Sequence, residues 1–409
     1  MTIIEFFDNT SIENIVSALL CNPDKVILVG DNGKRMKKYI DIYNEVLSNR
    51  NINVELRYKT VNKNNLSNII RILTEIVEEN ENCIFDLEGG EDLTLVAVGY
   101  IANMYKDKVM LHRFNIRNGS LIDCDSDGEV LQTAPMEISV EENIRIYAGK
   151  IITDFTTGYE WDFNEDFVSD LEVMWEICRE NSTRWNKLGF TLTQCGKACF
   201  EEETVIINEE TAGISWRRKT EELDFALLKR LKSIGLINNY IANDDLIKFQ
   251  FKNEQIRRCI VKAGQLLELY ITLVAKSAKD KYNKPIYNDV QTGVLLNWDG
   301  FVDTPETPEM IRTTNEIDLI LMKGLVPVFI SCKNGMVDVD ELYKLSSVAE
   351  RFGGKYAKKV LIVSDLDASN SNYKYITSRA EDMNIRLIDD VADLNAKDLE
   401  RAIASLWSN

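Results

Sequence analysis

The chain has 409 residues, of which 45% are hydrophobic and 28% are charged, and its formal net charge at pH 7 is −18. This composition excludes a disordered chain and predicts two or three domains, and the strong negative charge excludes binding of nucleic acid through bulk positive charge. The single histidine, His112, excludes chemistry that needs two histidines, such as that of two-histidine ribonucleases.

Short apolar strands and amphipathic helices alternate over residues 1–135, a pattern typical of a parallel, doubly wound α/β sheet. Strands are expected at 2–7, 25–30, 52–58, 83–89 and 108–115, and helices near 11–20, 34–49, 64–80 and 92–106. A hairpin after the last strand is expected to complete the domain. We therefore predict a Rossmann-like domain over 1–135.

A different pattern follows over residues 136–255. The stretch TDFTTGYEWDFNEDFVSDLEVMWE is acidic with interleaved aromatic residues, and we interpret it as a connector or as a docking surface between subunits or domains. Further on, a helix, two strands and another helix resemble a winged-helix unit, a fold that often binds DNA. Lys229, Arg230 and Lys232 could serve that purpose, but we favour a structural or dimerising role for this unit.

The pattern returns to α/β over residues 256–409. Strands are expected at 293–298, 315–324, 326–333, 358–365 and 385–390, and helices at 256–277, 338–352, 371–383 and the C-terminus. The second and third of these strands meet at a tight turn, which predicts a β-hairpin with a largely buried interior.

Polar residues interrupt this hairpin. Glu316 and Asp318 are two residues apart and share a face, as do Ser331 and Lys333, while Cys332 points away. A carboxylate beside a lysine in a buried hairpin is costly unless it has a task. Asp318 could bind a divalent cation, and Lys333 could orient a water and stabilise charge on a phosphorane.

The preceding helix adds a carboxylate, because Glu268 interrupts its apolar stripe. A helix with Glu, a strand with Asp and a strand ending in Lys resemble the layout of the PD-(D/E)XK nucleases over residues 260–390, a restriction-endonuclease-like fold. The resemblance implies a metal-dependent endonuclease that uses Mg²⁺ or Mn²⁺. It implies the catalytic residues Glu268, Asp318, Ser331 and Lys333, and the metal ligands Glu268, Asp318, Glu316 and the carbonyl of Cys332. Ser331 departs from the family, which has a second acid there.

Three loops at strand ends are candidates for ligand binding, because ligands gather at the carboxyl ends of strands in open α/β sheets. They are FFDNTS at 6–11, VGDNGKR at 29–35 and DLEGGEDLT at 86–94. Small polar residues and glycines allow the backbone of these loops to approach a phosphate or ribose. None of them matches G-x-G-x-x-G, which argues against a dinucleotide oxidoreductase.

With its DLEGGEDLT segment, the N-terminal pattern resembles the CRISPR-associated Rossmann-fold (CARF) sensor domain. The whole chain thus resembles the CARF-linked nucleases that accompany type III CRISPR systems. The resemblance implies an antiviral nuclease that cuts single-stranded DNA, RNA or both when a cyclic oligoadenylate binds. A homodimer is implied, and cyclic tetra-adenylate is the expected activator because a two-fold ring suits a two-fold dimer. The implied ligand contacts are Asp8, Asn9, Thr10, Ser11, Gly30, Asp31, Asn32, Gly33, Lys34, Gly89, Gly90 and Thr94.

Two other functions remain open. A sensor domain with a winged-helix unit would suit a ligand-responsive transcription regulator, and Ser331 could mark a non-catalytic scaffold. The eight cysteines form no compact framework and are expected to be reduced, and no apolar run approaches the roughly 20 residues of a membrane span. The first residues lack the features of a signal peptide. We therefore expect a cytoplasmic protein without a membrane partner.

Overall fold

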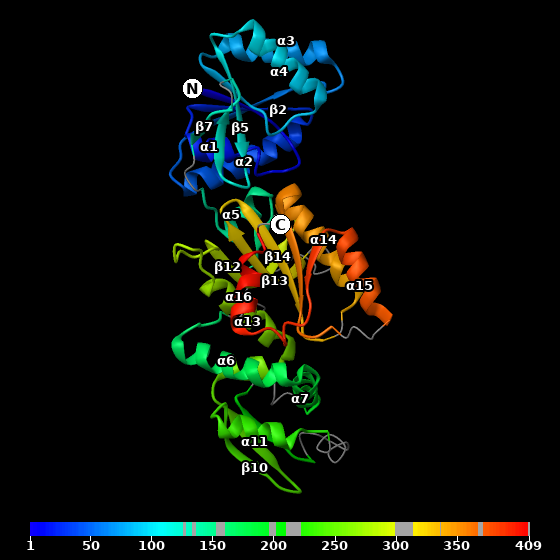
Figure 1. The fold of residues 1–409 in the computed structure, drawn as a ribbon. Helices are drawn as coiled ribbons and strands as arrows, with labels where there is room; N and C mark the ends of the chain where they lie inside the picture. The colour runs from blue at the N-terminus through cyan, green and yellow to red at the C-terminus, as the bar shows by residue number, and fades with distance from the viewer. Residues whose placement is uncertain are drawn as a thin grey trace.

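The protein is elongated, with three parts in a row (Figure 1). In this computed structural model the described residues are 1–125, 128–132, 136–152, 160–195, 202–209, 222–298, 314–335, 337–366 and 371–407. A seven-stranded sheet lies at one end, a six-stranded sheet in the middle, and a three-stranded sheet at the other end. The mixture of helices and sheets confirms the predicted α/β class.

The N-terminal part is a doubly wound sheet with the order β3-β2-β1-β4-β5-β6-β7. Its strands are β1 Thr2–Phe6, β2 Lys25–Gly30, β3 Glu55–Thr60, β4 Cys83–Asp86, β5 Val109–Asn115, β6 Ser120–Asp123 and β7 Val130–Gln132. The first five are parallel, and β6 and β7 are antiparallel. The strand order reverses between β1 and β4, so the carboxyl ends of β1, β2 and β4 lie side by side.

Four helices cover this sheet: α1 Val16–Cys21, α2 Gly33–Asn49, α3 Leu66–Glu79 and α4 Asp92–Met104. The apolar residues of α1 and α2 join the core on one face, and those of α3 and α4 join the core on the other. The helix predicted near 11–20 begins only at Val16, because residues 11–15 form consecutive turns. Ile12 and Ile15 in those turns are nevertheless buried, which explains their helix-like spacing.

The middle part is a mixed sheet with the order β16-β15-β14-β13-β12-β8. Its strands are β8 Lys150–Ile151, β12 Asp289–Asn297, β13 Thr314–Lys323, β14 Val326–Lys333, β15 Lys358–Val363 and β16 Ile385–Ile388. Its helices are α5 Val140–Ile146, α13 Ala263–Ser277, α14 Val339–Gly353, α15 Ser371–Asp382 and α16 Ala396–Ala404, with the short 3-10 helix η3 at Gly354–Tyr356. The apolar residues of α13 and α16 join the core on one face, and those of α5 and α14 join the core on the other.

The third part contains α6 Glu165–Glu180, α7 Ser182–Gln194, β9 Thr204–Ile207, α11 Phe225–Ser233, β10 Ile237–Ala242, β11 Ile247–Phe251 and α12 Glu254–Val261. Its antiparallel sheet has the order β10-β11-β9. The single helix predicted over 256–277 is wrong, because the backbone leaves the helical region at Lys262, with φ −99° and ψ 78°. The break lets α12 contact α7 while α13 packs against the six-stranded sheet.

The hydrophobic cores run across these parts. One core joins the α2 side of the N-terminal sheet to the α14 side of the six-stranded sheet, with α5 between them. A second joins the α13 side of that sheet to the three-stranded sheet. The cores therefore do not stop at the predicted divisions after residues 135 and 255. Among the described helices, none has both the length and the apolar character that crossing a membrane requires.

Candidate functional site

The hairpin of β13 and β14 brings Asp318 beside Ser331 and Cys332. Its carboxylate oxygen Oδ2 accepts the Cys332 N–H at 2.6 Å and the Ser331 hydroxyl at 3.2 Å. Regular pairing of the strands ends one step earlier, at Leu319 and Ile330. The Asp318 carboxylate thus accepts a hydrogen bond from the Cys332 backbone N–H just beyond the last regular pair of the two strands. This bond fixes the carboxylate against β14.

A break in the strand alternation accompanies Asp318. Ile317 belongs to the core on the α14 side, whereas Leu319 belongs to the core on the α13 side. These two residues should share a face if the strand were regular. In the neighbouring strand, Gly293 lies opposite the break with φ +62°, a conformation that favours glycine. The glycine thus allows both strands to change face where the carboxylate is placed.

A second carboxylate, Glu268 on α13, faces this position. Burial raises its pKa well above the ordinary value, and the charges of Asp318 and Glu316 raise it further. Burial also raises the pKa of Asp318, although the Cys332 N–H and the charge of Lys333 oppose the shift. A bound divalent cation would relieve the repulsion between these two half-buried carboxylates.

Lys333 completes the cluster at the end of β14. Its Nζ forms an ion pair with Glu341 Oε2 at 3.1 Å, a partner on α14 that the sequence did not single out. Burial lowers the pKa of Lys333, but attraction to Asp318, Glu341 and Glu268 outweighs it and leaves the pKa raised. The lysine therefore remains a cation that can orient a water or stabilise an anionic transition state.

The donor set limits how a metal could be held. Among the residues that the structure describes, no three His, Cys, Asp or Glu side chains form a metal-binding group. Glu316 is exposed, and the Cys332 side chain is buried in the core on the α13 side, while its carbonyl as a metal ligand stays a prediction. Glu268 and Asp318 remain as a pair of hard oxygen ligands, which suits a Mg²⁺ or Mn²⁺ ion that takes its other ligands from water and substrate.

A cavity of about 310 Å³ opens at the carboxyl ends of β1, β2 and β4. Of the predicted ligand contacts, seven line it: Asp8, Asn9, Gly30, Asp31, Asn32, Gly90 and Thr94. Five do not line it: Thr10, Ser11, Gly33, Lys34 and Gly89. Two cations of the lining, Arg35 and Lys63, were missed by the sequence analysis.

The polar groups of this cavity are held in place by neighbours. Asn14 accepts the Asp8 N–H at 2.8 Å and donates to the Asp8 carbonyl at 3.0 Å, which fixes the first loop. Arg35 donates to the Asn9 side chain and lies over the Phe7 ring, 5.6 Å from its centre. Lys63 pairs with Glu91 at 2.8 Å and with Asp31 at 3.4 Å. The cavity is therefore lined by paired charges and presents both donors and acceptors.

The loop of residues 86–94 needs a glycine at position 89 because its backbone packs closely against β1. A Cβ on Gly89 would lie 2.2 Å from the backbone oxygen of Phe6, far inside the contact distance. Gly90 has φ +102° and itself lines the cavity. The first glycine thus lets the loop pack against β1, and the second brings the backbone to the cavity wall.

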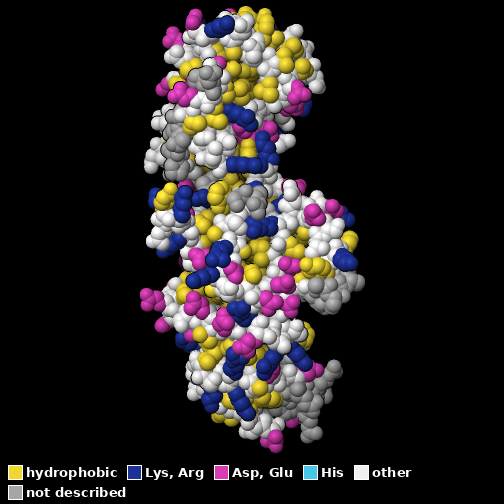
Figure 2. Space-filling view, viewed as in Figure 1, with side chains coloured by type: hydrophobic (Ala, Val, Ile, Leu, Met, Phe, Trp, Pro, Cys, Tyr) yellow, Lys and Arg dark blue, Asp and Glu magenta, His cyan; other side chains and the backbone are white. Residues whose placement is uncertain are grey.

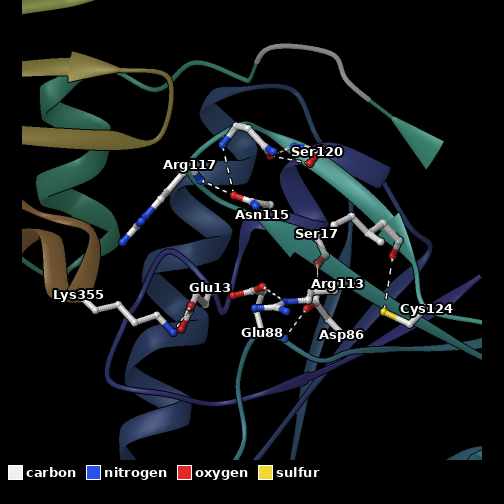
Figure 3. Close-up of polar contacts among 12 residues, drawn as sticks. Glu13, Ser17, Asp86, Glu88, Arg113, Asn115, Arg117, Ser120, Cys124 and Lys355 are labelled. Carbon is white, nitrogen blue, oxygen red and sulfur yellow. Dashed lines mark hydrogen bonds and ion pairs between the residues drawn. The ribbon is translucent and has the colours of Figure 1, made fainter. Parts of the chain in front are cut away.

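The N-terminal part contacts the middle part through buried acids (Figure 3). Glu13, only 1% exposed, accepts Lys355 Nζ and the Tyr356 hydroxyl, each at 2.6 Å. The same hydroxyl lies 3.2 Å from Glu88, which pairs with Arg113 at 2.8 Å. Burial raises the pKa of Glu13 to about 7, although Lys355 and Tyr356 lower it. This junction joins the β1–α1 loop, which also lines the cavity, to η3.

The basic residues of the winged-helix-like segment are engaged within the chain. Arg230 forms an ion pair with Glu180, and the Lys232 Nζ lies 5.8 Å from the centre of the Tyr240 ring. These contacts give the Arg230 and Lys232 side chains a structural role. The assignment of a winged-helix unit stays a prediction.

Comparison with known proteins supports the fold over the full chain. No protein-family model matches the sequence, and no curated protein matches it. Protein VC1899 from Vibrio cholerae superposes with a TM-score of 0.74 at 19% identity, over 99% of this chain and 97% of its own. Can2 from Sulfobacillus thermosulfidooxidans, in complex with cyclic tetra-adenylate, has a TM-score of 0.67 at 17% identity, over 100% of this chain and 99% of its own.

The chain shares the fold of these two proteins. The resemblance to CARF-linked CRISPR nucleases that the sequence suggested is thereby confirmed at the level of the fold. The matched length includes the N-terminal sheet with its cavity, the part with the three-stranded sheet, and the hairpin with Asp318.

Proposed function

We propose that this protein is a metal-dependent nuclease that a cyclic oligoadenylate activates in type III CRISPR antiviral defence. The observation that carries the proposal is the pair of partly buried carboxylates with raised pKa values, Glu268 and Asp318, with Lys333 beside them. The fold shared with Can2, which was solved with cyclic tetra-adenylate, supports the regulatory half of the proposal.

The carboxylates and the lysine have separate roles in this proposal. Glu268 and Asp318 would bind a Mg²⁺ or Mn²⁺ ion, which supplies Lewis acidity to phosphodiester hydrolysis when bound. Ser331 and the Cys332 N–H hold the Asp318 carboxylate in one orientation. Lys333, kept protonated by its carboxylate neighbours, would orient the attacking water and stabilise negative charge on the phosphorus centre.

The strand-end cavity is the proposed activator site. Arg35 is placed to contact a phosphate or an adenine ring, while Asp31 and Asn32 present acceptors and donors at the same edge. One cavity of about 310 Å³ is too small for a whole cyclic tetra-adenylate, so we propose that two cavities in a homodimer share the ring.

An exposed apolar face on α4 supports the homodimer. Leu93, Val96, Tyr100 and Met104 lie on one side of the helix and are 37%, 57%, 51% and 53% exposed. Hydrophobic side chains gather over the end of the molecule that carries α3 and α4 (Figure 2). Exposed apolar patches mark interaction surfaces, and α4 begins beside Glu91 and Thr94 of the cavity. Pairing through α4 would therefore bring two cavities together.

The test is cleavage of labelled single-stranded DNA, single-stranded RNA and duplex DNA, with Mn²⁺ or Mg²⁺ and with or without cyclic tetra-adenylate. We expect cleavage of a single strand only with both metal and activator. Lys333→Ala should lower the rate by at least a hundredfold. The control Lys344→Ala removes an exposed lysine that shares Glu341 and should cleave at the wild-type rate. Full activity of Lys333→Ala would overturn the site, and duplex binding without cleavage would instead indicate a regulator.

The activator site has its own test. Arg35→Ala should weaken binding of cyclic tetra-adenylate about tenfold, whereas Lys34→Ala, beside it in sequence but outside the cavity lining, should change it little. Isothermal titration calorimetry measures both affinities. Equal losses in the two variants would place the ligand elsewhere.

A further inference from the structure

A second cavity lies where the N-terminal part meets the six-stranded sheet. Its volume is about 780 Å³, and it is lined by the β5–β6 turn, η3, the beginning of β15, α15 and β16. Five basic side chains line it: Arg117, Lys355, Lys358, Lys359 and Arg386. Two acidic side chains line it: Glu350 and Glu381. A basic excess of this kind is unexpected in a chain with a net charge of −18.

Three of these cations have no acidic partner in the part of the chain that the structure describes. No described carboxylate forms an ion pair with Arg117, Lys358 or Arg386, whereas Lys355 pairs with Glu13 and Lys359 with Glu350. In Figure 3 the Arg117 side chain extends from its turn away from the N-terminal sheet. The cavity therefore gathers positive charge from two parts of the molecule, and described carboxylates neutralise only part of it.

The geometry of the cations suits phosphate groups. The Arg386 guanidinium is oriented by the Ser405 carbonyl at 3.1 Å and the Ser405 hydroxyl at 3.0 Å, so it is already held in one position. Burial and the nearby charge of Arg117 lower the pKa of Lys358, which shows that the two cations repel each other. A bound anion would relieve this repulsion, and guanidinium groups bind phosphate oxygens in pairs.

The cavity is separate from both sites described above. It shares no lining residue with the strand-end cavity. Lys358 pairs with Val328 at the beginning of the parallel strands, whereas Lys333 pairs with Val363 at their end. Five residues separate the two levels, which corresponds to about 16 Å along the sheet. A ligand in this cavity would therefore not contact the proposed catalytic residues.

We propose that this cavity binds a phosphate-bearing ligand of nucleotide size. Its volume lies within the range of about 300–1,000 Å³ that small-molecule sites occupy. Ala357 and Leu387, which are partly exposed, supply an aliphatic surface for a sugar or base, and the cations without a carboxylate partner supply the phosphate contacts. The phosphates could belong to a free nucleoside triphosphate or to a short single strand of nucleic acid. Either ligand would contact Arg117 on one side and β15 on the other.

The test is calorimetric titration of the full chain in EDTA, so that no divalent metal occupies the proposed active site. The probes are ATP, inorganic triphosphate and a five-nucleotide single-stranded DNA, each alone. We expect at least one probe to bind wild type and to lose about tenfold or more in affinity in the Arg117→Ala, Lys358→Ala double variant. If the double variant does not fold, Lys358→Gln alone should still lower the affinity about threefold.

Two control variants separate this site from general charge and from the activator cavity. Arg401→Ala removes a cation on α16 whose side chain is 78% exposed and lies outside the cavity, and Arg35→Ala alters the strand-end cavity. Arg401→Ala should bind the probe as wild type does. In the Arg35→Ala background, the Arg117→Ala, Lys358→Ala pair should lower probe affinity by the same factor as in wild type. A response to ATP and triphosphate would assign a nucleotide site, and a response to the oligonucleotide alone would assign a site for a strand. Absence of binding at millimolar probe, an equal loss in Arg401→Ala, or no further loss from the pair in the Arg35→Ala background would overturn the proposal.

Discussion

Removal of one hydroxyl from the junction between the N-terminal and middle parts should lower the unfolding free energy by an amount that depends on pH. In Tyr356→Phe, Glu13 loses the hydroxyl donor at 2.6 Å and keeps Lys355 as its partner. Its other carboxylate oxygen, Oε2, already has no hydrogen-bond partner in the structure. Since a hydrogen bond to a charged group contributes about 1.5–3 kcal/mol, the variant should lose about 2 kcal/mol of unfolding free energy when Glu13 is ionised.

The sign of the pH effect follows from the raised pKa of Glu13. Its folded value of about 7 exceeds the ordinary 4.5, so this residue favours folding most when the carboxyl is protonated, and that contribution is lost as the pH rises through 7. Tyr356→Phe removes a donor that lowers this pKa, so its folded pKa rises further. The loss of stability should therefore be large near pH 8.5 and less than about 1 kcal/mol near pH 6.

Urea unfolding of wild type and Tyr356→Phe at about pH 6 and pH 8.5 measures this difference. Glu5 and Asp86 also have raised pKa values, but they are present in both proteins and cancel when the two are compared at one pH. Tyr282→Phe, at an exposed tyrosine, should match wild type at both pH values. An equal loss at the two pH values would refute the argument that Glu13 ionises at this junction.

Three further substitutions test the active site, the activator cavity and the dimer. Glu268→Gln removes a charge that repels Asp318, so it should stabilise the metal-free protein by about 1–2 kcal/mol. The same variant should abolish the shift in melting temperature that MnCl₂ causes in wild type. An unchanged shift would contradict the role of Glu268 as a metal ligand. For wild type, Mn²⁺ affinity should fall as the pH is lowered, because protons compete for carboxylates with raised pKa values. Gly89→Ala would drive a Cβ against the Phe6 carbonyl and should lower the unfolding free energy by about 1–3 kcal/mol in urea titrations, whereas a loss below about 0.5 kcal/mol would show that the loop yields. Val96→Glu should convert a dimer to a monomer in light scattering, and an unchanged mass would exclude the α4 face.

Strands were predicted best where apolar runs are bounded by turns. β2 and β14 have the predicted limits, 25–30 and 326–333, because both strands are buried on two faces and lie beside turns with polar or glycine residues. The helix break at Lys262 could not be predicted, since the apolar spacing continues from α12 into α13 and both helices enter the same core. β8, with two residues, has no periodicity at all and depends on its pairing with β12.

Site residues were predicted where their contacts depend on local strand geometry, and missed where they depend on helix packing or on a long side chain. A tight hairpin fixes which residues of β13 and β14 face each other, so the neighbourhood of Asp318 and Lys333 was foreseeable from spacing alone. Glu341 was missed because its contact with Lys333 depends on how α14 packs on the sheet. Arg35 was missed because a long side chain reaches back to the cavity from the first turn of α2. Lys63 follows β3, so the strand-end rule could have found it.

The pairing of β8 with β12 has a practical consequence for isolated fragments. Lys150 and Ile151 cover the edge of β12 at Asn297 and Leu296, and they precede the C-terminal α/β region by about a hundred residues of chain. A fragment beginning at residue 256 would leave that edge of the sheet with free backbone N–H and C=O groups. Open edges recruit strands from other molecules, so the truncated C-terminal α/β region is expected to self-associate unless residues 136–152 are supplied with it.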